Sequence, residues 1–117
     1  MIPASSRFHG HNSLRFVYTN GKAVRSERLT LKWVKNTRRT KSRFSIVVSK
    51  KVMKSAIGRN RIRRRLYEYA RLHTGQLADT YDIVLIVTSP ELRDMEAAEL
   101  TSLLDQLFQR AELYKTP

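Results

Sequence analysis

The sequence contains no cysteine, which excludes disulfide bonds and metal sites built from thiolates. Its longest uninterrupted apolar run, residues 83–87, is far shorter than the roughly 20 residues of a membrane-spanning helix. The first six residues lack the apolar core of a signal peptide. No segment rich in proline or glycine divides the chain, so we expect a single domain over residues 1–117, with allowance for flexibility in residues 1–10. These absences favour a cytoplasmic protein that has no membrane partner.

Acidic residues are almost missing from the first 75 residues, where Glu27 and Glu68 stand against 20 lysines and arginines. The last 42 residues reverse the balance with eight acids against three bases, so local charges of +18 and −5 sum to +13. A net charge of this sign and size predicts a polyanionic partner, nucleic acid before membrane. We therefore expect the nucleic-acid surface on the first two-thirds of the chain and a scaffold in the last third.

Groups suited to protein-based catalysis are also scarce in the basic part of the chain. A protein nuclease needs a general base and acid, or carboxylates that bind metal. Glu68 is better explained as an ion-pair partner on a helix, His73 as a packing residue, and the pair His9 and His11 lacks a third metal ligand nearby. We therefore expect no catalytic residue and no metal ligand on this chain, and no small-molecule substrate.

Hydrophobic periodicity and turn residues predict six structural elements. In chain order they are a short helix from Asn12 or Ser13 that stops at Asn20 and a left-handed Gly21, strands at 28–34 and 43–49, a helix at 59–73, a strand at 81–88 and a helix at 94–113. This α-β-β-α-β-α order predicts an α+β protein in which the helices cover a small sheet as a two-layer α/β sandwich. The apolar stripe of the last helix is expected to pack on the strand at 81–88, the most apolar of the three.

The densest positive charge lies at residues 59–65, which hold five arginines, one asparagine and Ile62. At 100° per residue, an apolar stripe and an opposite ridge separate on this helix. The stripe consists of Ile62, Leu66, Tyr69, Ala70 and His73. The ridge, expected to point outward, consists of Asn60, Arg64, Tyr67 and Arg71, flanked by Arg61, Arg63 and Glu68. Because guanidinium groups grip phosphate oxygens in pairs, this helix predicts a nucleic-acid contact; the alternative is a solvated basic face.

The arginine run and its surroundings resemble the signature of the protein subunit of bacterial ribonuclease P. In that family an Arg-Asn pair, two further residues, a basic residue and an arginine precede a glutamate, and the run follows a strand that ends in Ser-Lys-Lys. The matching residues are Ser49, Lys50, Lys51, Ala56, Arg59, Asn60, Arg61, Ile62, Arg63, Arg64, Glu68 and Arg71. Weaker matches in the same order extend over nearly the whole chain, at Arg7, Phe8, Leu14, Val17, Gly21, Asp82, Ile83, Val84, Leu107 and Phe108.

This resemblance implies that the arginine helix forms an unusual left-handed crossover between two parallel strands of a small mixed sheet, where general rules favour the right-handed form. It also implies a large RNA partner that is itself the catalyst. Protein and RNA together would act as an endoribonuclease that removes the 5′ leader of precursor tRNA, with Mg²⁺ bound mainly by the RNA. The chain would assist by binding both the catalytic RNA and the leader.

Two sets of site residues follow from the resemblance. The residues expected to contact the catalytic RNA are Lys50, Lys51, Arg59, Asn60, Arg61, Arg63, Arg64 and Arg71. A leader cleft between the sheet and the first helix is expected at Phe16, Tyr18, Lys32 and Trp33, since single strands bind basic grooves with aromatic platforms. For Phe16 and Trp33 the alternative is packing in the core. The loop at 38–41 either touches phosphate or is solvated.

Two positions depart from the family pattern. Leu14 stands where phenylalanine is common, which removes an aromatic platform, and Tyr67 stands where arginine is common, which removes a cation but keeps a ring. The alternative function is a small basic ribosomal or other structural RNA-binding protein, although such proteins often carry their charge on long tails. A helix-turn-helix DNA-binding protein is disfavoured, because a loop and a strand precede the arginine helix.

Overall fold

The computed structural model describes residues 11–115, and the side chains from residue 14 onward. The expectations for Arg7, Phe8, the His9 and His11 pair and the flexibility of residues 1–10 lie outside these described parts. The elements in chain order are α1 (His11–Asn20), β1 (Lys22–Arg25), β2 (Leu29–Lys35), β3 (Arg43–Val48), α2 (Ala56–His73), β4 (Tyr81–Val87) and α3 (Ala97–Arg110). Two short 3-10 turns, η2 (Thr74–Gln76) and η3 (Pro90–Arg93), follow α2 and β4.

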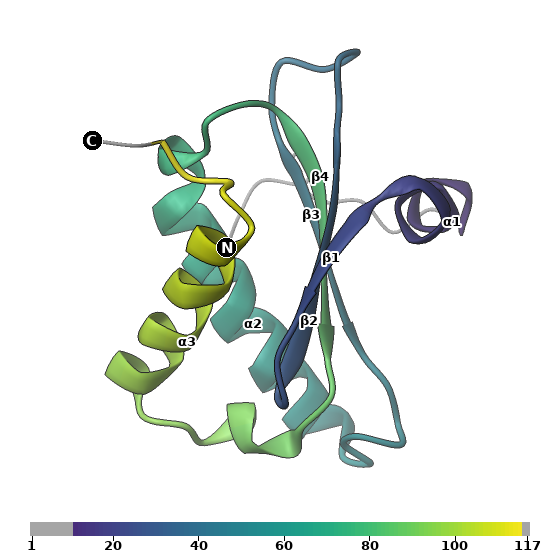
Figure 1. The fold of residues 1–117 in the computed structure, drawn as a ribbon. Helices are drawn as coiled ribbons and strands as arrows, with labels where there is room; N and C mark the ends of the chain where they lie inside the picture. Colours follow the sequence, from purple (N-terminus) through teal and green to yellow (C-terminus); the bar gives the residue numbers. More distant parts are fainter. Residues whose placement is uncertain (1–10, 116–117) are drawn as a thin grey trace.

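The four strands form one mixed sheet in the order β1-β2-β4-β3. Strands β3 and β4 are parallel and are connected through α2, whereas the other neighbours are antiparallel. Helices α2 and α3 lie on one face of the sheet and α1 on the other (Figure 1). The predicted α+β class is therefore confirmed. The two-layer description is wrong for α1, which adds a partial third layer on the opposite face.

Strand β1 is absent from the predicted order, which is a correction to the sequence analysis. It has four residues, of which only Val24 is even partly buried, so it gives almost no alternating hydrophobic signal. Pairing with β2 forms it, and Ser26 closes the hairpin. The Ser26 hydroxyl accepts hydrogen bonds from the backbone N–H groups of Arg28 and Leu29 at 3.3 and 3.2 Å. A short edge strand of this kind depends on its neighbour rather than on its own composition.

Alternation along the strands sends two sets of side chains to the two faces of the sheet. On the α2–α3 face, Leu31, Ile46 and Leu85 belong to the main core cluster, which includes the apolar stripes of both helices. On the α1 face, Val84 packs against Val17, a residue of α1 that is fully buried between the helix and the sheet. The predicted strand at 81–88 is thus buried on both faces.

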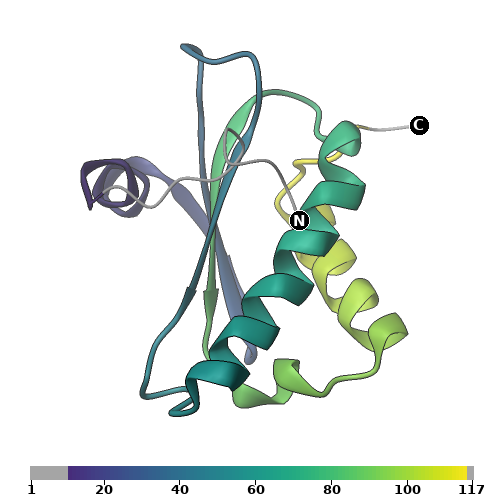
Figure 2. The ribbon, with the colours of Figure 1, turned by 180° about the vertical axis from the view of Figure 1, so that it is seen from behind.

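The apolar stripes predicted for the two long helices are confirmed. The α2 stripe is buried at Ile62, Leu66, Tyr69 and Ala70, and the α3 stripe at Leu100, Leu104, Leu107 and Phe108. The stripe of α3 belongs to the same core cluster as β4, but the strand that α3 approaches most closely is β1, so its packing on β4 stays a prediction. Figure 2 shows α2 running across the sheet from the end of β3, with α3 beside it.

A polar cluster joins the end of α2 to α3 and to the C-terminal segment. The Tyr69 hydroxyl donates to Asp105 Oδ1 at 2.5 Å and lies 2.5 Å from the Tyr114 hydroxyl. Burial raises the pKa of both tyrosines, so they stay neutral. His73 stacks on Tyr69 with ring centroids 4.0 Å apart, consistent with the packing role expected for it.

Gly21 follows α1, but not in the left-handed conformation that the sequence predicted, since none of the described glycines has a positive φ. Glycine is required at this position because two backbone segments approach it closely. A Cβ atom there would lie 2.5 Å from the Val17 carbonyl oxygen and 2.7 Å from that of Trp33. Gly21 therefore lets the end of α1 come against the backbone of β2.

Candidate nucleic-acid interface

The arginine-bearing helix α2 begins three residues earlier than predicted, at Ala56. Ser55 is its N-cap: the side-chain oxygen accepts a hydrogen bond from the Gly58 N–H at 3.1 Å. Serine is among the preferred N-cap residues because it satisfies one of the free N–H groups of the first turn. The capping signal was thus present in the sequence, in the stretch between the strand predicted at 43–49 and the helix predicted at 59–73.

The segment at residues 49–55, the lysine loop, is fixed against the first turn of α2. The Arg59 Nη1 donates to the carbonyl oxygens of Met53 and Lys54 at 3.0 and 2.8 Å. A Cβ atom on Gly58 would meet the Met53 sulfur at 2.7 Å, so the absence of a side chain there admits Met53. Lys50 and Lys51 are exposed on this loop. Arg59 therefore holds the loop in place, and the two lysines are presented beside the helix start.

Two further arginines of α2 bind the backbone of the segment that follows β4. Arg65, which we did not single out from the sequence, donates to the carbonyl oxygens of Leu92 at 2.7 Å and Arg93 at 3.1 Å, and also to that of Met95. Arg61 Nε donates to the Arg93 carbonyl oxygen at 2.8 Å. A guanidinium has five N–H groups, so the exposed Arg61 keeps donors for another ligand. The half-buried Arg65 instead anchors η3 and the segment that leads into α3.

Replacing Arg65 by alanine is expected to destabilise the fold by about 1.5–3 kcal/mol, because it removes charge-assisted hydrogen bonds to carbonyl groups. Urea unfolding measures this loss. The adjacent Arg64 is exposed, so Arg64→Ala is the matched control and should change the free energy of unfolding by no more than about 0.5 kcal/mol. Equal effects of the two substitutions would contradict the different roles assigned to these neighbours.

The outward face of α2, the arginine ridge, consists of Asn60, Arg64 and Arg71, which are all exposed. Tyr67 was predicted to belong to it, and this is wrong: its side chain is only 8% exposed and joins the main core cluster. The stacking ring expected there is therefore not available at the surface. The buried arc of α2 is wider than a simple apolar stripe.

Hydrogen bonds along α2 orient the ridge and its flank. Arg63 Nη1 donates to Asn60 Oδ1 at 2.8 Å. Arg71 forms an ion pair with Glu68, donating through Nε at 3.1 Å and through Nη2. This pairing lowers the pKa of Glu68 and raises that of Arg71. An open depression of about 400 Å³ between Arg61, Arg64, Arg65 and Glu68 borders the ridge.

The four residues expected in a leader cleft are separated by the structure into three places. Tyr18 and Lys32 lie together, with the Lys32 ammonium 5.3 Å from the centroid of the Tyr18 ring. Phe16 lies on the other flank of α1, because residues 16 and 18 stand about 100° to either side of the buried Val17. Trp33 faces the opposite side of the sheet, where it packs against the main core cluster. Trp33 therefore fits the packing alternative.

Strand register shows which end of the sheet each flank of α1 faces. Val48, at the end of β3, is level with Val87 and, through it, with Leu29 at the start of β2. The lysine loop therefore lies at the β2 start. Lys32 is nearer to that end than Val34 is, so the Tyr18 flank faces the lysine loop. The Phe16 flank faces the other end, where residues 36–42 form the β2–β3 loop.

The described part of the chain contains neither a cluster of candidate metal ligands nor a helix that could span a membrane. Among residues 11–115, no three histidine or acidic side chains come together as candidate metal ligands. Within the same residues, every helix is too short or too polar to cross a bilayer.

Comparisons with known proteins agree with this geometry. The family model described as Ribonuclease P matches residues 2–112. The ribonuclease P protein component of Exiguobacterium sibiricum is 32% identical over 99 residues, which cover 85% of this chain and 84% of that one. The ribonuclease P protein of Thermotoga maritima has a TM-score of 0.76 at 26% identity, covering 88% of this chain and 96% of that one. The Staphylococcus aureus protein has a TM-score of 0.83 at 23% identity, covering 94% and 98%, and supports the fold alone.

Proposed function

Because this chain belongs to the ribonuclease P protein family and is the protein subunit of that endoribonuclease, we propose that its arginine ridge and lysine loop bind the catalytic RNA while the Tyr18 flank of α1 holds the 5′ leader of precursor tRNA. The observation that carries this proposal is the division among the arginines of α2. Arg65 binds backbone carbonyl groups and so stabilises the fold, whereas Arg64 is exposed on the ridge. A ridge held rigid by its own neighbours can meet phosphates at little entropic cost.

The proposed contact set for the catalytic RNA is the one implied by the family pattern. Its members are Lys50, Lys51, Arg59, Asn60, Arg61, Arg63, Arg64 and Arg71. Arg59 and Arg61 each donate some of their N–H groups to backbone carbonyls, so they contribute to RNA binding through the N–H groups that remain. The same family pattern supports a left-handed crossover through α2, which stays a prediction.

The proposed leader site follows from the Tyr18 flank of α1. The Lys32 ammonium lies over the Tyr18 ring there, and the flank faces the end of the sheet that carries the lysine loop, so the leader and the catalytic RNA would be bound near the same end of the sheet. Stacking on aromatic rings is tolerant of base identity because every base has a π-face. This chain is therefore expected to hold leaders of many sequences.

The family implies Mg²⁺-dependent catalysis, and we propose that the ions are held mainly by RNA phosphates. Mg²⁺ in such sites takes one or two carboxylates together with phosphates. The acid nearest the arginine ridge is Glu68, which is bound by Arg71, so it is a poor candidate for a metal ligand. The residues of this chain bind and orient RNA, and the only positive charges that they bring to it are their own.

Titration of the chain with the catalytic RNA at several salt concentrations tests the phosphate contacts. If six to eight phosphates are neutralised, the logarithm of the binding constant should fall with the logarithm of salt at a slope of about −4 to −7. A slope near −1 would mean that the arginine ridge is not the RNA surface.

Replacing Tyr18 by alanine is expected to weaken binding of precursor tRNA to the holoenzyme by about 5- to 150-fold, the range for one stacked base. Binding of mature tRNA, which lacks the leader, should not change. Tyr18→Phe keeps the ring and is the matched control. Equal weakening with precursor and mature tRNA would contradict a leader site at Tyr18.

A further inference from the structure

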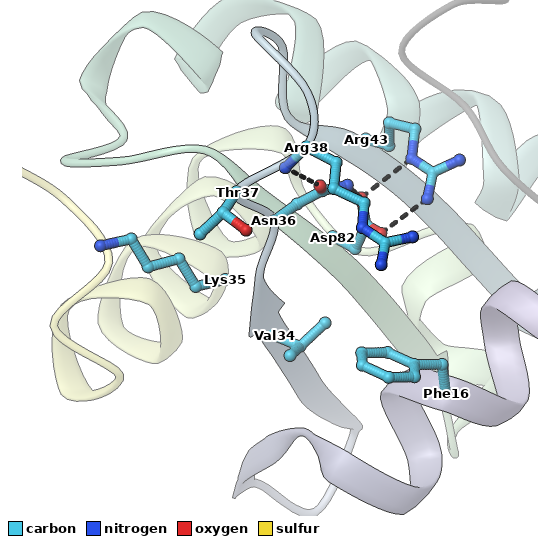
Figure 3. Close-up of a pocket in the computed structure, with 8 residues that line it drawn as sticks. All are labelled: Phe16, Val34, Lys35, Asn36, Thr37, Arg38, Arg43 and Asp82. Carbon is cyan, nitrogen blue, oxygen red and sulfur yellow. Dashed lines mark hydrogen bonds and ion pairs between the residues drawn. The ribbon is translucent and has the colours of Figure 1, made fainter.

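Four large apolar side chains are exposed among the described residues, and two of them lie on the flanks of α1. Phe16 lines a pocket of about 370 Å³ (Figure 3), and Tyr18 lies beneath the Lys32 ammonium. The other two, Ile57 and Leu72, belong to α2, and the proposed function gives neither of them a role. The Ile57 side chain is the most exposed of the four, at 74%.

Ile57 stands at the centre of the outward face of α2. At 100° per residue, Arg64 and Glu68 point about 20° to either side of Ile57, and Arg61 points about 40° away from it. Leu66 points about 180° away and is fully buried. A single exposed aliphatic side chain is common on protein surfaces. This one, however, lies in line with the arginine ridge, two helical turns before Arg64.

Hydrogen bonds on both sides hold the turn that carries Ile57. Before it, the Ser55 side chain accepts from the Gly58 N–H at 3.1 Å. After it, Arg59 Nη1 donates to the Lys54 carbonyl oxygen at 2.8 Å. A β-branched side chain also has one strongly preferred rotamer in a helix. A contact made by Ile57 therefore costs little conformational entropy.

The charges around Ile57 favour a polyanion as its partner. Lys51 and Lys54 are exposed just before it in the chain, and Arg64 is exposed beyond it on the ridge. The partial positive charge of the first helical turn acts in the same direction. A polyanion that also presents an apolar surface suits an aliphatic side chain in this setting. Unpaired bases of RNA present such a surface, whereas bases within a duplex are stacked.

We propose that Ile57 packs on an unpaired base of the catalytic RNA, while the lysine loop and the arginine ridge hold the phosphates on either side of that base. The inference rests on the proposed function and deepens it. Phosphate contacts attract any RNA and carry no sequence information directly. Ile57 adds an apolar contact that salt does not screen and that a fully paired RNA does not offer. It is a binding residue that helps to select the catalytic RNA.

Binding titrations of the full chain at several salt concentrations test this contact. Ile57→Ala should weaken binding of the catalytic RNA by about 5- to 50-fold at every salt concentration, because buried apolar surface is lost. The salt slope should not change, since no phosphate contact is lost. Arg64→Ala should instead make the slope shallower by about 0.7–0.9. Binding of a fully paired RNA of similar length should be the same for Ile57→Ala and the unmodified chain.

Leu72→Ala is the matched control. Leu72 is 60% exposed on the same helix, about 22 Å from Ile57 at the carbonyl end, where the partial negative charge disfavours phosphates. Its replacement should leave binding of both RNAs nearly unchanged. Alanine is a better helix former than isoleucine, so Ile57→Ala should not lower the midpoint of thermal unfolding. A lowered midpoint would assign Ile57 to the fold rather than to RNA.

The two variants on the ridge separate this contact from the proposed function. If Arg64→Ala makes the slope shallower but Ile57→Ala binds as the unmodified chain does, the contact at Ile57 is wrong and the arginine ridge stands. If neither variant changes binding, both fall. Equal losses with the catalytic and the paired RNA, or equal losses for Ile57→Ala and Leu72→Ala, would overturn selection by Ile57. If Ile57→Ala lowers the mass of the free chain in light scattering, Ile57 instead contacts a second copy.

Discussion

Replacing Arg63 and Arg64 together by alanine is expected to weaken binding of the catalytic RNA by about 100-fold, if each lost arginine costs at least ~1.5 kcal/mol of charge-assisted hydrogen bonding. Arg64 is exposed on the ridge, and Arg63 is held beside it by Asn60. The salt slope should also become shallower by about 1.4–1.8, since two phosphate contacts are lost. Binding titrations at several salt concentrations measure both quantities.

The matched control removes the same charge elsewhere. Arg25 on β1 and Arg110 at the end of α3 are both exposed and lie outside the proposed RNA surface. Their double replacement by alanine should leave the salt slope nearly unchanged. If the two double variants lose the same slope and affinity, the RNA responds to net charge alone and the ridge has no special role.

Replacing Asp82 by alanine is expected to destabilise the protein by about 3–5 kcal/mol, the loss typical of breaking a buried ion pair. The Arg43 and Asp82 side chains are only 13% and 9% exposed, and two hydrogen bonds join them. Without the carboxylate, the guanidinium stays largely buried and its charge is no longer balanced by its ion-pair partner. Asn36 also loses the acceptor for its amide group. Urea unfolding followed by circular dichroism measures the change.

Two further variants identify the cause of that loss. Asp82→Asn keeps an acceptor oxygen and the volume, so it should cost less than Asp82→Ala. The double replacement Arg43→Met with Asp82→Leu removes both charges, and because apolar pairs can substitute for buried ion pairs it should be more stable than Asp82→Ala alone. A loss below about 1 kcal/mol for Asp82→Ala would mean that solvent reaches Arg43 and that the pair adds little.

Much of the fold follows from local patterns in the sequence. The alternating strands and the i, i+3, i+4 stripe of α3 appear where periodicity placed them, with shifts of a few residues at helix ends. Strand β1 could not be found this way, because pairing with β2 rather than its own residues makes it a strand. The face of the sheet that α1 covers is likewise set by tertiary packing and not by its own sequence.

Most residues of the candidate site were predicted from the sequence, but their arrangement in space was not. The exposed ridge at Asn60, Arg64 and Arg71 was expected, whereas the burial of Tyr67 was not, since contact with the core extends beyond the apolar stripe. Two of the separations among the residues expected in the leader cleft could have been predicted from the sequence. Neighbouring residues of a strand face opposite sides, which divides Lys32 from Trp33. Residues two apart on a helix diverge by about 200°, which divides Phe16 from Tyr18.

The backbone contacts of the arginines could not be read from the sequence. Arg61 and Arg65 bind carbonyl groups of the segment after β4, which only the fold brings to α2, whereas Arg59 binds carbonyl groups of the lysine loop five and six residues before it. A run of arginines therefore combines structural and RNA-binding roles, and residue type alone does not separate them.

A processing assay tests the central claim most directly. The chain is mixed with a bacterial ribonuclease P RNA and precursor tRNA at low Mg²⁺, and release of the 5′ leader is followed over time. We predict that the chain accelerates release, that the Arg63→Ala, Arg64→Ala variant does so much less, and that the chain without RNA releases none. No acceleration by the intact, folded chain would contradict its action as the subunit that assists this ribozyme.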